Sequence, residues 1–128
     1  VSIEKCPWSA ATEARDLATA GIGIMPLTDD EWTHGKCAFK LLQYMAAALP
    51  CVGSAVGANL DVVVEDQTGF LAADSAAWTS QLASLLGQPD RAADMGTAGR
   101  DRVREHYDTR VVSSQAADLL DRVVSARL

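Results

Sequence analysis

The distribution of apolar residues along the chain predicts four short strands. A nearly unbroken apolar run covers residues 22–27, and a second, shorter one covers residues 50–54. Such runs are typical of strands that are buried on both faces of a parallel sheet. Residues 1–6 alternate weakly between apolar and polar side chains, and residues 70–72 form a short apolar stretch after a turn. We therefore expect strands at all four places.

Between and after these runs, apolar residues recur at spacings of three and four, which predicts amphipathic helices. Ser9 is a candidate cap for the first helix, Asp74 or Ser75 for a later one, and Pro89 suits a first helical position. Residues 28–35 are polar and are expected to form a loop. The expected helices cover residues 10–20, 36–49, 60–64, 75–87, 90–106 and 109–127.

The order of these elements indicates the fold class. Strands that alternate with helices imply right-handed crossovers and a parallel sheet. We expect an α/β fold of the Rossmann-like type, with helices on both faces of the sheet and extra helices at the carboxyl end. A chain of 128 residues suffices for one domain but not for two, so residues 1–128 are taken as a single domain. The chain opens on a strand without an initiator methionine, so we expect it to be part of a longer chain.

Composition excludes several classes of protein. Apolar residues make up 48% of the chain, yet no apolar run approaches the ~20 residues that a membrane-spanning helix needs. The net charge of −6 disfavours nucleic-acid binding, which depends on neutralising phosphates. The three cysteines, Cys6, Cys37 and Cys51, are odd in number and widely spaced. This pattern favours neither a metal site nor a disulfide framework, and it is typical of a reducing, cytoplasmic setting.

Ligands of parallel α/β sheets bind beyond the carboxyl ends of the strands, and one segment there carries candidate chemistry. Gly35 follows the predicted strand at 22–27 and permits a close backbone approach and a positive φ. The amides and the dipole of the helix that starts at residue 36 favour an anion. Lys36 and Lys40 are four residues apart, and they are the only lysine or arginine residues between Asp16 and Asp90. These features predict a diphosphate site; the alternative is that both lysines are merely solvated.

The same segment resembles a known family. Residues 35–46 (GKCAFKLLQYMA), followed by residues 49–52 (LPCV), are similar to the donor-site helix and the next strand of family-4-type GT-B glycosyltransferases. The flanking segments that share the resemblance are residues 22–27, 54–57 and 64–71, with Met95, Gly96, Gly99, Arg100 and Tyr107. The resemblance thus covers nearly the whole chain. It identifies the chain as part of the carboxy-terminal, donor-binding domain of a GT-B enzyme.

The resemblance also implies site residues. Backbone amides around Lys36 to Phe39 would hold the phosphates of the donor, and Gln43 would bind its ribose. The family's usual pattern has glutamates at the positions of Gly35 and Gln43, so this sequence departs from that pattern at both. The residues expected to bind the donor and its phosphates are Gly35, Lys36, Cys37, Ala38, Phe39 and Lys40.

The implied function is transfer of a sugar from a nucleotide-diphosphate sugar to a glycan, lipid or small-molecule acceptor, with retention at the anomeric carbon. The resemblance implies no cofactor and no bound metal, and it assigns no catalytic residue here. It further implies an amino-terminal GT-B domain as partner, without which this segment would be inactive, and through which contact with a membrane surface could occur. The rival hypothesis is a non-catalytic flavodoxin-like module that binds a partner or a phosphorylated small ligand.

Other side chains in the expected loops have two interpretations. Trp8 follows the first predicted strand, where it would either contact the nucleobase or pack into the core. His34 would contact a sugar or would be an ordinary polar loop residue. The acidic residues 29–31 could coordinate Mg²⁺, but runs of this kind are usually solvated. Trp78 fits the apolar face of its helix and is expected in the core.

Overall fold

A computed structural model describes residues 2–126 and shows a three-stranded parallel sheet in the order β1-β2-β3. The strands are β1 (Gly23–Met25), β2 (Cys51–Ser54) and β3 (Phe70–Ala72). In the register of the sheet, Ile24 lies beside Val52, and Gly53 lies beside Leu71. The α/β fold class and three of the four predicted strands are confirmed.

The strand predicted at residues 1–6 is wrong for the part that the structure describes. Residues 2–9 have no regular structure, and Ile3 is 86% exposed. The alternation in this segment was weak, and in residues 2–126 no strand pairs with it. An isolated stretch of extended chain has no ladder of hydrogen bonds to hold it as a strand. Val1 lies outside the described residues.

One face of the sheet is covered by α3 (Phe39–Ala46) and α4 (Asn59–Val62). The side chains of Leu41 and Met45 from α3 are fully buried there. The ring of Tyr44 lies on the backbone of β1, because Gly23 has no Cβ to keep it away. A Cβ at that position would come within 2.3 Å of Tyr44 Cγ. The first core cluster therefore fills the space between α3 and the sheet.

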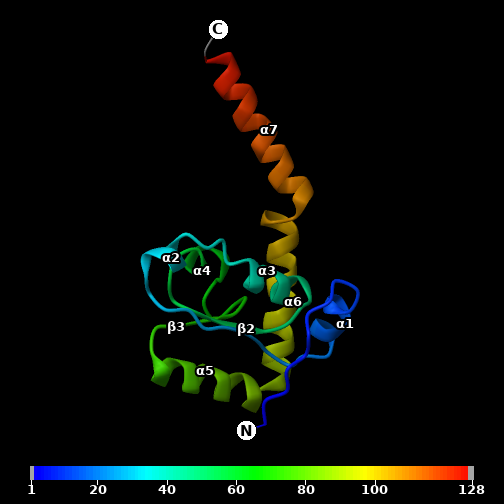
Figure 1. Cartoon of the computed structure of the whole chain (residues 1–128), viewed down its shortest axis with the longest axis vertical. Coiled ribbons are helices and arrows are strands. Elements are labelled where there is room, and N and C mark those ends of the chain that lie inside the picture. Colours follow the sequence, from blue (N-terminus) through cyan, green and yellow to red (C-terminus); the bar gives the residue numbers. More distant parts are fainter. Residues whose placement is uncertain (1, 127–128) are drawn as a thin grey trace.

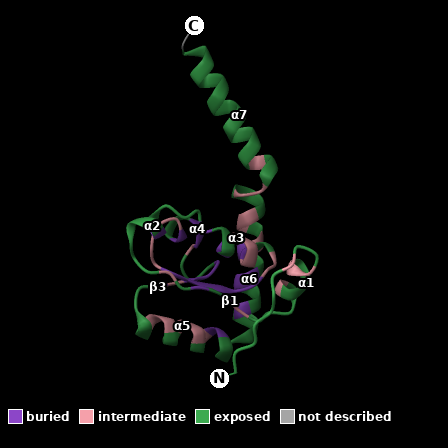
Figure 2. Ribbon diagram, viewed as in Figure 1, coloured by how far each residue is buried: buried purple, intermediate pink, exposed green. Residues whose placement is uncertain are grey.

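The opposite face is covered by α5 (Ser75–Gly87) and α6 (Pro89–His106). Val52 and Phe70 from the sheet pack there with Leu85 and Met95 from the two helices. Figure 1 shows α5 on this side of the strands, and Figure 2 shows the buried sheet between the helical layers. The expectation of helices on both faces is confirmed, and so are Asp74 as a helix cap and Pro89 as a first helical residue.

Helix α6 also crosses the end of α3 at very close range. A Cβ at Gly96 would come within 2.1 Å of the Ala48 carbonyl oxygen. Glycine is therefore the residue that allows the backbones to approach at this crossing. The contact places α6 directly against the turn that follows α3.

The two edges of the sheet differ. At the β3 edge, the Leu71 N–H donates to Glu65 Oε2 at 2.7 Å, and Gln81 Nε2 donates to the Leu71 carbonyl at 3.0 Å. At the β1 edge, the Ile24 side chain is 48% exposed, and its carbonyl accepts a hydrogen bond from the Tyr44 hydroxyl at 3.3 Å. Side chains thus occupy both outward backbone groups of Leu71.

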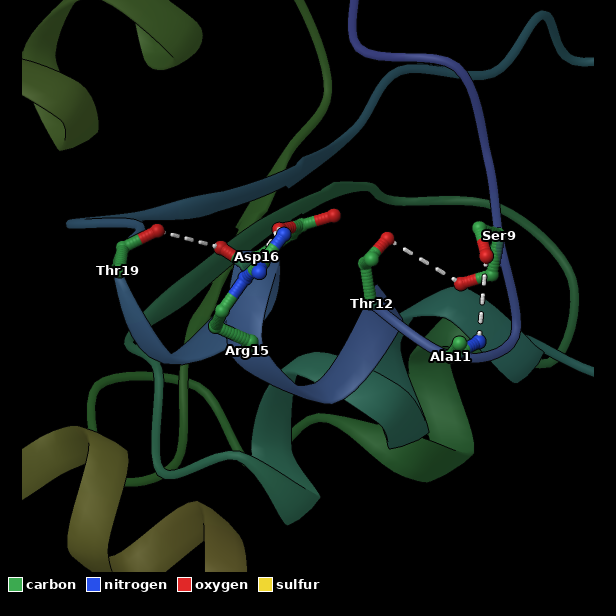
Figure 3. Close-up of polar contacts among 6 residues, drawn as sticks. All are labelled: Ser9, Ala11, Thr12, Arg15, Asp16 and Thr19. Carbon is green, nitrogen blue, oxygen red and sulfur yellow. Dashed lines mark hydrogen bonds and ion pairs between the residues drawn. The ribbon is translucent and has the colours of Figure 1, made fainter.

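Helix α1 (Glu13–Ala18) is shorter than the predicted 10–20, and Ser9 is not its cap. The Ser9 hydroxyl instead accepts from the Ala11 N–H at 3.3 Å, and the Ser9 carbonyl accepts from the Thr12 hydroxyl at 3.5 Å (Figure 3). These bonds close a turn before the helix begins. Helix α1 therefore starts only after this turn, at Glu13.

The last helix, α7 (Thr109–Ser125), projects from the rest of the molecule (Figure 1) and is almost wholly exposed (Figure 2). It confirms the predicted amphipathic helix, except that Arg127 lies outside the described residues. None of its residues is buried, and its apolar side chains face solvent. Within residues 2–126, no helix is both long enough and apolar enough to cross a lipid bilayer.

Candidate functional site

The loop that leaves β1 contains a short helix, α2 (Glu31–His34), where the sequence predicted only loop. Asp30 caps this helix, because its Oδ1 accepts from the Thr33 N–H at 2.7 Å. The Thr28 hydroxyl donates to Asp30 Oδ2 at 2.6 Å. The Thr28 hydroxyl first, and then the Thr33 N–H, hold the pKa of Asp30 below its ordinary value. An aspartate three residues before Thr33 is a pattern typical of a helix cap, so the sequence did contain a signal for α2.

Helix α3 begins later than the predicted residue 36. Its first residue is Phe39, and Ala38 precedes it with a φ of 55°, in the left-handed region. That conformation costs an alanine about 1–2 kcal/mol. The Lys36 N–H is not free to hold a ligand, because it donates to the Thr33 carbonyl at 3.0 Å and so ends α2. Gly35 has a φ of −80°, so the positive φ that glycine permits is not used at Gly35, and Ala38 adopts it instead.

The backbone amides that are available to a ligand therefore lie later in the chain than the sequence predicted. The first hydrogen bond of α3 runs from the Leu42 N–H to the Ala38 carbonyl at 3.2 Å. The amides of Phe39 and Lys40 precede that bond and have no acceptor within the helix. Together with the helix dipole, they make the start of α3 attractive to an anion.

A cavity of about 580 Å³ opens between the end of β1 and the start of α3. The structure brings all six predicted donor-binding residues to its wall. Its other walls come from β1, from the residues just after it and from Tyr44. The lining residues are Gly35, Lys36, Cys37, Ala38, Phe39, Lys40, Ile24, Met25, Pro26, Leu27 and Tyr44.

Hydrogen bonds at the carboxyl ends of the strands hold the floor of this cavity. The Leu27 N–H donates to Ser54 Oγ at 2.8 Å, which ties the loop after β1 to β2. Asn59, only 2% exposed, donates to the Ser54 carbonyl at 2.9 Å. Gly57, with a φ of 51°, lets the loop after β2 come close to α2: a Cβ there would be 3.2 Å from the Cα of His34. These contacts hold the loops that follow β1 and β2 together beside the cavity.

The cavity wall also carries two charged side chains and a tyrosine whose pKa is shifted. Lys36 and Lys40 are both exposed, and in residues 2–126 neither forms a salt bridge. Burial, followed by the nearby Cys51, raises the pKa of Tyr44, so its hydroxyl stays protonated at neutral pH. The wall therefore offers two ammonium groups and two amides to an anionic ligand, together with apolar surface for its uncharged part.

Gln43 lies outside this cavity. Its Nε2 donates to Glu13 Oε1 of α1 at 2.9 Å, and both residues line a second hollow of about 370 Å³. Trp8 is 75% exposed, so it is not a core residue, and its Nε1 donates to the same Glu13 oxygen at 3.1 Å. Sequence reasoning missed Glu13, because 30 residues separate it from Gln43 and no local pattern links the two.

The remaining candidates have structural partners. His34 lies 2.5 Å from Asp29 through its Nε2 and does not line the cavity. Trp78 is half-buried and packs against the second core cluster, as predicted. Cys51 is buried, and burial raises its pKa to about 12, so it is an unreactive thiol.

Comparisons with known proteins identify relatives of the chain. The sequence profile described as Glycosyl transferases group 1 matches residues 10–88. Over 90 residues, the chain is 36% identical to alpha-maltose-1-phosphate synthase of Mycolicibacterium smegmatis, covering 64% of this chain and 23% of that protein. Over 77 residues, it is 31% identical to N-acetyl-alpha-D-glucosaminyl L-malate synthase of Bacillus anthracis, covering 59% of this chain and 20% of that protein.

Solved structures share the fold. Sucrose-phosphate synthase from Thermosynechococcus elongatus superposes with a TM-score of 0.74 at 23% identity, covering 87% of this chain and 27% of that one. Anabaena HepE in complex with UDP and glucose superposes with a TM-score of 0.74 at 14% identity, covering 84% and 29%. The chain thus spans about a quarter of the length of the proteins it matches.

Proposed function

The chain belongs to the glycosyl transferases group 1 family, and from this membership we propose that the cavity at the start of α3 binds the diphosphate of a nucleotide-sugar donor. One observation carries the proposal. All six residues expected from the sequence to hold the donor line one cavity, and two lysines without salt-bridge partners stand at its wall. A diphosphate would neutralise both ammonium groups and occupy the free amides of α3.

The activity we propose is transfer of the sugar from that donor to a glycan, lipid or small-molecule acceptor, with retention at the anomeric carbon. A uridine nucleotide is a supported donor class, because HepE has been solved with UDP, with UDP and glucose, and with UDP-glucose. The rest of a longer protein would supply the acceptor side of the cleft. This matches the quarter of its relatives' length that the chain spans.

The contribution of this chain would be to position the donor and to stabilise the diphosphate as it leaves. Negative charge builds on the leaving group when the bond to the sugar breaks. The amides of Phe39 and Lys40 are held in place by the start of α3 before the reaction, so they need little reorganisation, and the side chains of Lys36 and Lys40 would add positive charge beside them. We assign part of this role to the amides of Phe39 and Lys40 at the start of α3, because the expected Lys36 N–H already donates to the Thr33 carbonyl.

Calorimetry on the full-length protein tests the proposal. UDP- and GDP-sugars are titrated into the wild type and into Lys36→Ala and Lys40→Ala, with Lys5→Ala as the matched control outside the cavity. We expect the wild type to bind one donor class, each cavity variant to bind it roughly tenfold or more weakly, and the control to bind it unchanged. Absence of nucleotide-sugar binding by the wild type would sink the proposal and favour the flavodoxin-like module. Unchanged affinity in both cavity variants would contradict only the assignment of Lys36 and Lys40 to the diphosphate.

Thiol protection gives an independent measurement with an internal reference. Cys6 and Cys37 are both exposed, but only Cys37 lines the cavity. Bound nucleotide sugar is expected to slow alkylation of Cys37 by iodoacetamide and to leave the rate at Cys6 unchanged. Equal rates at Cys37 with and without a saturating ligand would place the ligand elsewhere. Mass spectrometry of the labelled peptides separates the two sites.

A further inference from the structure

We propose that Glu13 provides the carboxylate that binds the ribose hydroxyls of the donor nucleotide, in a nucleoside subsite formed by Trp8, Glu13 and Gln43. The inference rests on the proposed function, because it identifies the second part of the ligand whose diphosphate lies at the start of α3. Gln43 is a positioning residue in this subsite, and Glu13 is the residue that touches the ligand.

Three segments that are distant in the sequence converge on one carboxylate. Trp8 comes from the irregular amino-terminal segment, Glu13 is the first residue of α1, and Gln43 lies in the middle of α3. The indole N–H and the amide of Gln43 both donate to Glu13 Oε1, at 3.1 Å and 2.9 Å. Two donors on one oxygen fix the orientation of the carboxylate and leave its second oxygen directed elsewhere.

That second oxygen is available to a ligand. Within residues 2–126, Glu13 Oε2 forms no hydrogen bond, and Glu13 forms no salt bridge. The nearest arginine in the sequence, Arg15, pairs with Asp16 instead, as Figure 3 shows. A carboxylate accepts about four hydrogen bonds and donates none. Vicinal hydroxyls, which donate two hydrogen bonds side by side, satisfy the remaining acceptors.

The subsite lies within reach of the diphosphate. Gln43 follows Phe39 by one turn of α3, and Phe39 lines the cavity where the diphosphate is proposed. One turn advances about 5.4 Å along the helix axis, which is comparable to the span of a ribose from its 5′-carbon to its hydroxyls. The hollow beside Glu13 and Gln43 has a wall of small apolar residues, among them Ala14 and Ala46. The exposed ring of Trp8 offers a flat surface for the base.

The proposed subsite also explains why residue 43 is a glutamine and not a glutamate. A carboxylate there would lie about one hydrogen-bond length from Glu13 and would be repelled by it. An amide instead donates to Glu13 and holds it in place. The negative charge expected beside the ribose is therefore present in this chain, but α1 supplies it.

Calorimetry on the full-length protein separates the ribose contact from a general structural effect. The probes are UDP and GDP, of which the tighter is carried forward, the 2′,3′-dideoxy form of that nucleotide, and inorganic pyrophosphate. We expect Glu13→Gln to weaken binding of the ribonucleotide about tenfold, while the dideoxy form and pyrophosphate bind the variant and the wild type equally. Asp16→Asn is the matched control, because Asp16 lies on the same helix and pairs with Arg15. It is expected to change none of these affinities.

Two outcomes would overturn the assignment of Glu13. Equal affinity of wild type and Glu13→Gln for the ribonucleotide would show that Glu13 does not contact the ligand. An equal loss for the ribonucleotide and its dideoxy form would show that the variant only disturbs α1. If the wild type binds neither nucleotide nor pyrophosphate, the proposed function fails and this subsite fails with it. If it binds both and Glu13→Gln has no effect, only the subsite fails.

Discussion

At the scale of single residues, the site is built from exchanges between positions. The resemblance leads one to expect a glutamate at residue 43, and the chain has Gln43 there, hydrogen-bonded to Glu13. The left-handed conformation that Gly35 would permit is adopted by Ala38 instead. We propose that Glu13 supplies the carboxylate that the resemblance places at residue 43.

The change Gln43→Glu discriminates between two views of the nucleoside subsite. If Gln43 were a weak ribose ligand, a glutamate there would strengthen nucleotide binding. Because Glu13 stands 2.9 Å from the Gln43 amide, we expect the variant to place two like charges together and to lower nucleotide affinity roughly tenfold. Calorimetry with the preferred nucleotide at neutral pH measures the change. An increase in affinity would contradict the prediction and assign the ribose to residue 43.

Two glycines in helices provide a matched test of packing. Gly96→Ala is expected to lower the free energy of unfolding by about 3 kcal/mol, because the new Cβ would meet the Ala48 carbonyl oxygen at 2.1 Å and force α3 and α6 apart. Gly87→Ala is expected to raise it by up to about 0.5 kcal/mol, because no atom lies within 4 Å of the new Cβ and alanine is the better helix former. Urea denaturation measures both. Equal effects would refute the close helix crossing.

At the scale of elements, three helices begin at an aspartate whose side chain accepts a hydrogen bond from the first turn. Asp30, Asp74 and Asp108 cap α2, α5 and α7 in this way, whereas α1, α3, α4 and α6 have no side-chain cap. The two helices that start three residues later than predicted, α1 and α3, are both among the uncapped ones.

The start of α7 is expected to depend on pH through Asp108. The Arg110 side chain first, and then the Arg110 N–H, lower the pKa of Asp108 to about 2. A lowered pKa stabilises the folded form above the ordinary value of 3.8, and this contribution is lost as the pH falls from there through about 2. We expect the Cα chemical shifts of residues 109–112 to move toward coil values in that window.

The variant Asp108→Asn is the control for this titration, because its amide oxygen can still accept from the Arg110 N–H but cannot be protonated in the same range. Its shifts should not follow the same pH dependence. Loss of helix in the wild type around pH 6, or the same titration in the variant, would assign the effect to another group.

The elements could be predicted from the sequence where local patterns and burial agree. The run at residues 50–54 is buried throughout between two helical layers, so every side chain there had to be apolar or small. The run at residues 22–27 is the edge strand and its end, where Gly23 and Met25 are buried and Ile24 is exposed. The start of α3 could not be predicted, because Lys36 ends α2 through a backbone bond and no residue type signals this. The six predicted residues of the cavity wall are contiguous in the sequence, whereas Glu13, beside the second hollow, comes from another element and could not be predicted.

At the scale of the whole molecule, the chain divides into an α/β body and a projecting helix. No residue of α7 is buried, so the helix adds little to the stability of the body. We expect deletion of residues 109–128 to change the free energy of unfolding by less than about 1 kcal/mol. It should also leave nucleotide affinity unchanged, because the cavity is formed by residues 24–44.

Urea denaturation of the deletion variant measures this expectation, with Leu85→Ala as the positive control. Leu85 is only 4% exposed, and its truncation is expected to cost about 2–5 kcal/mol. A deletion variant that loses cooperative unfolding would show instead that α7 is part of the folding unit.

The unequal edges of the sheet have a consequence for how the sheet can be extended. An uncovered edge strand is a template for further strands and hence for aggregation, and proteins protect such edges with charged or polar groups. Glu65 and Gln81 occupy the outward backbone groups of Leu71, so a further strand cannot form hydrogen bonds with Leu71 at the β3 edge. A strand that enlarges the sheet, from this polypeptide or from another, would therefore join more readily at β1, where Tyr44 bonds the Ile24 carbonyl alone among the outward groups of that residue in residues 2–126. Two sheets that meet through their β1 edges would present only closed edges, so growth would end with that pair and could not continue into a fibre.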